Sequence, residues 1–366
     1  MVSFGLCASF LSVMTTISYI ILAVVVLLLM ITIHEFGHYT FGKWLGFKIN
    51  EFSVGFGKAI FSKKRKNGEV FSIRIIPLGG YCAFAGEDED DKDPNAFNNK
   101  PCWKRIIVLL GGVTFNFLSA IIFSFILLVS FGYDIPKVQE ASVNQQYVYE
   151  YNQTVPDEEK IGSLQNGDVI RAIDGKKISF ITGNTYANLI SSYKVGDKFT
   201  LTVQRVGEKE YVSFETTKFD DGKTDGGILG IVSSPYRYSF VEALRDCVPL
   251  TCAFAWKVLV FLFMLITGGV ALTDIGGPIT TIGVVAEYSQ MNIANLFVFL
   301  PLIAANLAVF NILPIPSLDG SRIVFTLIEM IRRKPINRKV EGYIHLAGIC
   351  VLFAFVIFVD IFNLIW

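Results

Sequence analysis

Residues 21–38 read ILAVVVLLLMITIHEFGH, an apolar run that ends directly in two histidines and a glutamate. A run of this length predicts a membrane-spanning helix, which we assign to residues 13–34. Ionisable side chains at membrane depth are costly and usually functional, so the HEFGH segment predicts a site. The composition agrees with an integral membrane protein that also has a water-soluble part, since 52% of the residues are hydrophobic and 17% are charged.

The two histidines of this segment have the spacing of a metal site. His34 and His38 are four residues apart, so on a helix they share one face and both imidazoles can bind one zinc ion. Glu35 then stands beside the metal and can take a proton from the attacking water, as in zinc hydrolases. A purely structural histidine pair is the alternative, and its place at the end of an apolar span argues against it.

Four of five apolar stretches are expected to be transmembrane helices. The stretches are residues 13–34, 106–131, 250–272, 293–313 and 343–365. The short connections after the first and the fourth are basic and should face the cytoplasm, so the long segment 132–246 should lie outside. The number of crossings between two cytoplasmic loops is even, so one stretch does not cross. We assign 250–272, which contains Lys257, to an interfacial helix, and an ordinary fifth span is the alternative.

The long connection after the second stretch has the pattern of a small β-rich domain. Residues 166–175 read NGDVIRAIDG and residues 195–205 read VGDKFTLTVQR, which are short strands with glycine turns. They resemble a bacterial PDZ domain, a fold that binds extended peptides at a sheet edge. A module that only filters substrates by size is the alternative. The expected domains are 1–131 with two spans and a cytoplasmic β-hairpin, 132–246 as the extracytoplasmic PDZ-like domain, and 247–366 with the interfacial helix and two spans.

A catalytic zinc site needs a third protein ligand, and the sequence offers a remote candidate. The metzincin pattern fails, because Gly42 stands one place too late and no third histidine follows. Asp319 lies in NILPIPSLDG, residues 311–320, and follows the span 293–313. It reaches the membrane side of His38 only if 250–272 does not cross. A turn-forming Asp-Gly is the alternative for Asp319, and His345 is a rival ligand.

With HEFGH, the PDZ-like insert and NILPIPSLDG in this order, the chain resembles the site-2 protease family, of the regulator of sigma-E protease type. The resemblance implies that His34, His38 and Asp319 bind Zn²⁺ and that Glu35 is the general base. It also matches GVTFN, residues 112–116, to a motif whose asparagine, here Asn116, helps to polarise the scissile carbonyl. An amide that only packs between helices is the alternative for Asn116.

The same resemblance predicts where substrate binds. SVGFG at 53–57 and FSIRIIPLGGY at 71–81 read as a membrane-associated β-hairpin that receives substrate as an extended strand. The candidate substrate-binding residues are Gly55, Gly57, Gly79 and Gly80 on this hairpin and Asn306 and Asn311 on the third span.

The predicted function is intramembrane proteolysis by a zinc metalloendopeptidase in the bacterial inner membrane, with the active site towards the cytoplasm. By the resemblance, its substrates are single-span membrane proteins already trimmed outside the membrane, such as an anti-sigma factor or a remnant signal peptide. Membrane lipid is the other expected partner. No nucleic acid is expected, because 32 Lys and Arg balance 32 Asp and Glu. A zinc transporter, a prenyl-protein peptidase and an inactive adaptor are weaker alternatives.

Two further features predict no chemistry. The acidic run EDEDDKD at 87–93 lacks the regularly spaced oxygens of a calcium loop, so we interpret it as a solvated loop. The six cysteines have no metal-site or disulfide spacing, and we expect them to be packing residues.

Overall fold

The fold comes from a computed structural model that describes residues 2–87, 91–180, 182–208, 210–220, 222, 228–270 and 275–365, without the side chains of 2–12 and 364–365. Part of the acidic run, residues 88–90, lies outside the described residues, as do the end of the stretch 250–272 and the side chain of Cys7. The chain forms two compact units, one made of Met1–Ser124 with Phe254–Trp366 and the other of Phe125–Ala253. We call them the helical unit and the β-rich unit.

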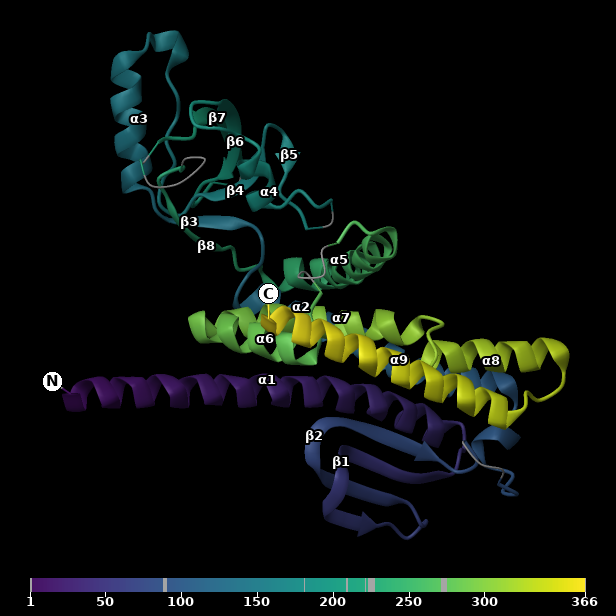
Figure 1. The fold of residues 1–366 in the computed structure, drawn as a ribbon. Coiled ribbons are helices and arrows are strands. Elements are labelled where there is room, and N and C mark those ends of the chain that lie inside the picture. The colour runs from purple at the N-terminus through teal and green to yellow at the C-terminus, as the bar shows by residue number, and fades with distance from the viewer. Residues whose placement is uncertain are drawn as a thin grey trace. The chain divides into compact units, whose positions relative to one another are not determined.

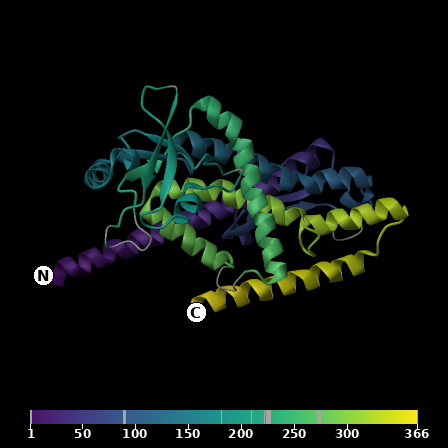
Figure 2. The same cartoon turned by 90° about the horizontal axis from the view of Figure 1, so that it is seen from above.

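The helical unit is built from long helices and one β-hairpin (Figure 1). Its elements are α1 (Val2–Trp44), β1 (Ile49–Lys64), β2 (Val70–Phe84), a 3-10 turn (Phe97–Asn99), the first part of α2 (Cys102–Ser130), the second part of α5 (Phe240–Thr267), α6 (Pro278–Met291), α7 (Ile293–Ile312), α8 (Asp319–Arg332) and α9 (Arg338–Ile365). In Figures 1 and 2, α9 runs back from the turn that follows α8, so these two helices form a hairpin.

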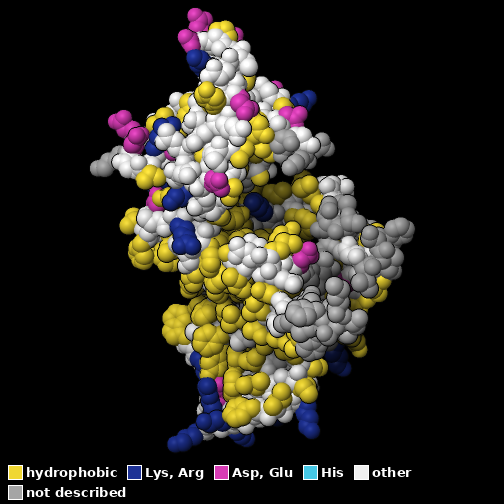
Figure 3. All heavy atoms as spheres, turned by 90° about the vertical axis from the view of Figure 1, so that its left-hand side faces the viewer, with side chains coloured by type: hydrophobic (Ala, Val, Ile, Leu, Met, Phe, Trp, Pro, Cys, Tyr) yellow, Lys and Arg dark blue, Asp and Glu magenta, His cyan; other side chains and the backbone are white. Residues whose placement is uncertain are grey.

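Five helices of the described chain are long and apolar enough to cross a membrane: Val13–Trp44, Cys102–Ser130, Phe240–Thr267, Ile293–Ile312 and Arg338–Asn363. They overlap the five apolar stretches of the sequence, and Figure 3 shows hydrophobic side chains crowded over one face of the helical part. Exposed apolar surface of this extent fits a protein in lipid rather than in water. The helix at 250–272 is one of the five, so the count of four spans stays a prediction.

In the helical unit, two helices were missing from the sequence prediction, α6 and α8. The segment of α6, PITTIGVVAEYSQM, is rich in β-branched residues, which are weak helix formers. Pro278 in the first turn favours the start of the helix. A tertiary contact compensates as well, because the carboxylate of Asp360 on α9 accepts the backbone N–H groups of Ile279 and Thr280 at 3.3 and 3.1 Å. An acceptor from a different helix cannot be recognised in the local sequence.

The helix α1 also extends beyond the predicted span 13–34. It continues to Trp44, so HEFGH lies within a helix and both histidines project from the same face. The backbone of α1 touches that of α2 at this level: a Cβ built on Gly111 would lie 2.7 Å from the carbonyl oxygen of Gly37. Only glycine permits such an approach of two membrane helices. The crossing therefore brings α2 against the histidine face of α1.

The predicted hairpin is present and longer than expected. Strands β1 and β2 pair in antiparallel register, with Val54 opposite Gly80, and the hairpin packs beside the C-terminal half of α1 (Figure 1). At its turn, the buried carboxylate of Glu69 pairs with Lys43 of α1 and with Arg65. Its association with a membrane stays a prediction.

The β-rich unit contains a mixed set of short strands and helices. Its elements are the end of α2, β3 (Pro136–Glu140), α3 (Ser142–Thr154), a 3-10 turn (Asp157–Glu159), β4 (Val169–Ile173), β5 (Lys176–Lys177), α4 (Tyr186–Ser191), β6 (Lys198–Gln204), β7 (Tyr211–Thr217), β8 (Val232–Pro235) and the start of α5. The strand order is β7-β6-β4-β3-β8, with β5 beside β4. Asp174 and Gly175 have φ of 47° and 71° in the turn between β4 and β5, where the sequence predicted one. The identification as a PDZ domain stays a prediction.

A buried ion-pair network fixes α8 within the helical unit. Glu329 of α8 is 5% exposed and pairs with Arg105 of α2 and with Arg338 at the start of α9, at 3.0 Å for the second pair. It also accepts the backbone N–H of Ile336 at 2.9 Å. This one carboxylate thus joins α8, α2 and α9. Because it anchors the C-terminal end of α8, it also helps to fix the position of the N-terminal end.

Replacing Glu329 by Ala should destabilise the protein strongly, because Arg105 would remain buried without its partner. Removal of one member of a buried pair costs on the order of 3–5 kcal/mol. We expect a clear fall in the Tm of the purified protein, measured by its intrinsic fluorescence. The exposed Glu150→Ala variant is the control, and an unchanged Tm for Glu329→Ala would contradict the role of the network.

Candidate active site

His34 and His38 lie on α1 and form one side of the site. Both side chains are buried, and their ring planes lie 83° apart with centroids separated by 4.7 Å. Their Nε2 atoms are 3.1 Å from each other. One helical turn of α1 therefore directs two imidazole nitrogens at a common point.

Asp319 completes a cluster of three possible ligands. It is the first residue of α8, and its Oδ2 lies 3.0 Å from Nε2 of His34 and 3.2 Å from Nε2 of His38. This oxygen is buried and receives no hydrogen bond from the described residues. Ligands at 2.0–2.1 Å around a tetrahedral zinc ion are about 3.3 Å apart, close to the spacing found here. The donor set and its geometry fit a zinc ion.

The surroundings of Asp319 favour its ionised form. Burial by itself would raise the pKa of this carboxyl group, and a protonated His38 or His34 of α1 lowers it. Its place at the N-terminal end of α8 adds the favourable field of the helix dipole. A carboxylate in this position is ready to bind a cation.

The turn before α8 determines where Asp319 lies. Ser317 has a φ of 84°, and its backbone N–H donates to Nδ1 of His345 at 3.1 Å. Gly320 is packed against the backbone of Leu313, where a Cβ would clash with the carbonyl oxygen. His345 thus supports the turn and does not belong to the three-residue cluster, which leaves Asp319 as the candidate ligand that the structure brings to the histidines.

The outer nitrogens of both imidazoles contact α2. Nδ1 of His38 lies 2.9 Å from the carbonyl oxygen of Val108, and Nδ1 of His34 lies 3.1 Å from Nδ2 of Asn116. Asn116 is completely buried. Its amide therefore lies behind the ring of His34, on the side away from the Nε2 atoms that face Asp319.

Glycines of α2 make room for this arrangement, a role that was not predicted from the sequence. A Cβ on Gly112 would lie 2.5 Å from both Cε1 of His34 and Nε2 of His38. The signal was the Gly-Gly pair at 111–112 inside an otherwise apolar stretch, but its meaning depends on which helix lies opposite. Gly112 is therefore part of the site although it has no side chain.

Glu35 lies between the histidines and the hairpin. Its Oε2 accepts the backbone N–H of Cys82 on β2 at 3.0 Å. Glu35, His38 and Asp319 line a cavity of 370 Å³ together with Tyr81–Phe84 of β2 and the ion pair of Glu87 with Arg322. The candidate base thus faces the backbone of a strand, which the sequence alone could not indicate.

The predicted substrate-binding residues are distributed unevenly. Gly80 lies next to Glu35, with 3.7 Å from a built Cβ to Cγ of the glutamate. Gly55, Gly57 and Gly79 all have positive φ and lie against other hairpin residues. On α7, Asn306 is exposed and Asn311 donates to the carbonyl of Leu307 at 2.9 Å. In the described part of the chain, neither asparagine forms a hydrogen bond to the three-residue cluster.

Comparison with known proteins points to one family. The sequence profile of peptidase family M50 matches residues 22–355. A protein of Fusobacterium nucleatum named "Putative zinc metalloprotease" is 31% identical over 94% of this chain and 98% of its own length. A protein of the same description in Nostoc is 30% identical, with 93% and 94% covered. The chloroplast membrane metalloprotease of Arabidopsis thaliana is also 30% identical, over 94% of this chain and 77% of its own.

Replacing Gly112 by Ala should weaken metal binding, because the added methyl group would displace both imidazoles. We expect the zinc affinity to fall by at least about tenfold, the scale reported for disturbed ligand orientation. The measurement is zinc competition with a chelator. Gly283→Ala is the matched control, since no atom lies within 4 Å of a Cβ built there. Equal zinc affinity in both variants would show that Gly112 is not part of the site.

Proposed function

Since the chain belongs to peptidase family M50, we propose that it is an intramembrane zinc metalloprotease in which His34, His38 and Asp319 bind the metal. The observation that carries the proposal is the convergence of three buried ligand atoms from α1 and α8. Two neutral imidazoles and one carboxylate are a ligand set of zinc hydrolases. The relatives named as zinc metalloproteases support the same metal.

Glu35 is proposed as the general base. Bound zinc would polarise the scissile carbonyl and lower the pKa of water at the site. Glu35 would take a proton from the attacking water on its carboxylate and pass it to the leaving amine nitrogen. Its bond to the N–H of Cys82 holds the carboxylate at the cavity wall, next to His38 and Asp319. Burial of the site limits the access of other nucleophiles.

The hairpin is the proposed substrate platform. Residues 81–84 of β2 line the cavity with Glu35 and Asp319, so an extended peptide beside this strand would have its backbone next to the metal ligands. Pairing through backbone groups tolerates many side chains, which suits a protease that cuts different transmembrane segments. Single-span membrane proteins, already trimmed outside the membrane, are the proposed substrate class.

Four spans are proposed, on the basis of helix direction. The histidines near the C-terminal end of α1 meet Asp319, which follows α7, so α1 and α7 run in the same sense. The helix α2 runs in the opposite sense, because its Val108 contacts His38 and its later Asn116 contacts His34. The chain between α2 and α7 then begins and ends on the far side and makes an even number of crossings.

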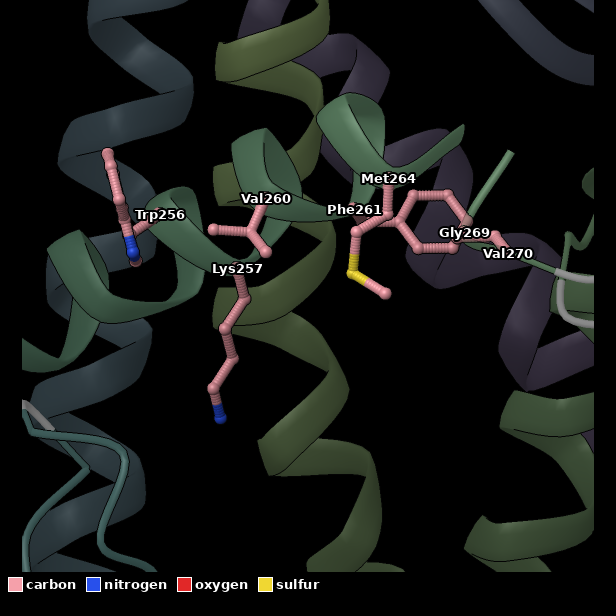
Figure 4. Close-up of a pocket in the computed structure, with 7 residues that line it drawn as sticks. All are labelled: Trp256, Lys257, Val260, Phe261, Met264, Gly269 and Val270. Atoms are coloured by element: carbon pink, nitrogen blue, oxygen red, sulfur yellow. The ribbon is translucent and has the colours of Figure 1, made fainter. Parts of the chain in front are cut away.

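Within that segment α5 is long enough to cross alone, but α6 is not. Its 14 residues extend about 21 Å, against about 30 Å for a bilayer core. We therefore propose that α5 lies at the outer interface. Figure 4 shows Lys257 extending from α5 beside Val260, and the neighbouring Trp256 is 66% exposed. A lysine and a tryptophan within the apolar part of α5 suit the headgroup region.

The β-rich unit is proposed to be a PDZ-like domain on the outer side of a bacterial inner membrane. A cavity of 510 Å³ lies along α4 and the edge strand β8, lined by Tyr186, Ile190 and Val232 among others. An edge strand beside a helix can accept an extended peptide, and the same surface could restrict large outer domains. Either action would select substrates that have been shortened first.

The substitution Glu35→Gln should abolish cleavage and leave zinc binding intact, because it removes the base and none of the metal ligands. We expect a loss of about 10²–10⁴-fold, the usual contribution of general acid–base catalysis. A tagged single-span substrate and the zinc content are measured on the same preparations. Glu150→Gln, on the exposed face of α3, is the control. Wild-type cleavage by Glu35→Gln, or a wild-type protein without zinc, would refute the proposal.

Accessibility of single cysteines should reveal the topology in intact cells. In a cysteine-free background, a membrane-impermeant maleimide should label Lys176→Cys and Gly269→Cys but not Lys66→Cys or Lys334→Cys, all of which replace exposed residues. Gly269 follows α5, so its label reports whether that helix crosses. Protection of Gly269→Cys with labelling of Lys176→Cys would mean that α5 is a span.

A further inference from the structure

The two candidate histidine ligands differ in what fixes their protonation. An imidazole that binds zinc through Nε2 carries its proton on Nδ1 and must donate it to an acceptor. For His38 this acceptor is the backbone carbonyl oxygen of Val108, which can only accept. For His34 the partner is the side chain of Asn116, whose amide has both a donor and an acceptor atom.

We propose that Asn116 is a positioning residue that holds His34 in its metal-binding tautomer, by accepting the Nδ1 proton with its side-chain oxygen. The proposal rests on the proposed zinc site. It differs from the role implied by family resemblance, in which the amide donates to the scissile carbonyl.

The amide of Asn116 has one atom with a partner and one without. Nδ2 of Asn116 faces Nδ1 of His34, while Oδ1 is buried and has no partner among the described residues. With Nδ2 as the donor, Nδ1 must accept and Nε2 must carry the proton, and a protonated Nε2 cannot bind a metal. A half-turn about the Cβ–Cγ bond exchanges the two amide atoms and breaks no hydrogen bond of Oδ1. Oδ1 then meets the Nδ1 proton, and Nε2 is free for the ion.

The geometry of α2 explains why an asparagine is needed at this position. Carbonyl oxygens of a helix point towards its C-terminal end, and side chains lean towards its N-terminal end. The carbonyl of Val108 and the side chain of Asn116 therefore converge on the same level of α2, at Gly112, where both rings lie. A backbone carbonyl of α2 reaches the ring of His38. The ring of His34 needs a side chain instead, which Asn116 provides from one turn after Gly112.

The experiment measures zinc affinity of the full-length protein by competition with a chelator. Asn116→Leu keeps the branched outline of the side chain and removes the acceptor, and we expect its zinc dissociation constant to rise about 10–100-fold, as for other lost partners of metal-bound histidines. Asn116→Asp keeps an acceptor and removes the donor, and its zinc affinity should stay within about threefold of wild type or increase. Ser119→Ala, one turn later on the same helix, should bind zinc like the wild type.

Cleavage by the same variants separates the two roles. Under our proposal Asn116→Asp still cuts, whereas loss of an essential donor would reduce cleavage about 10²–10³-fold with zinc retained. Wild-type zinc affinity in Asn116→Leu, or loss of cleavage in zinc-loaded Asn116→Asp, would overturn the proposal. If Asn116→Leu does not fold, the aspartate variant alone decides. A wild-type protein that binds no zinc would instead refute the proposed function.

Discussion

The contact of α1 with α2 at Gly37 and Gly111 is the constraint on which the site depends. The two backbones touch there, and a side chain on either glycine would force the helices apart. Because they touch, the imidazoles of His34 and His38 fit beside Gly112 and reach hydrogen-bond partners on α2. Without a hydrophobic driving force between helices in lipid, such close packing is what holds membrane helices together.

The third member of the cluster comes from far along the chain and is placed by a different set of contacts. His345 on α9 fixes the turn before α8, and the pair of Glu329 with Arg105 ties the far end of α8 to α2. Asp319 is thereby held at the histidines from both sides. These polar contacts are costly to bury, so they are maintained only where geometry satisfies each charge.

The β-hairpin lies between the three-residue cluster and a surface proposed to bind peptides. Glu35 accepts a hydrogen bond from the backbone of β2, and the same strand lines the cavity at Asp319. Glu35 and β2 therefore line the same cavity. The proposed cleavage of helical membrane segments would need such a strand, because a helical peptide bond is shielded by its own hydrogen bonds until the segment is extended.

Local patterns in the sequence were sufficient to predict the apolar helices, the hairpin and the candidate residues His34, Glu35 and His38, because length, hydrophobicity and residue spacing are properties of short segments. Asp319 was a candidate only through the need for a third ligand and the family resemblance, since its own segment also reads as an Asp-Gly turn. The helix α6 and the roles of Gly112 and His345 were not predictable, because each depends on a partner from a distant segment. The same reason applies to Asn116. Its residue type was visible in the sequence, but only tertiary structure placed its amide behind His34, where an acceptor and a donor have opposite consequences.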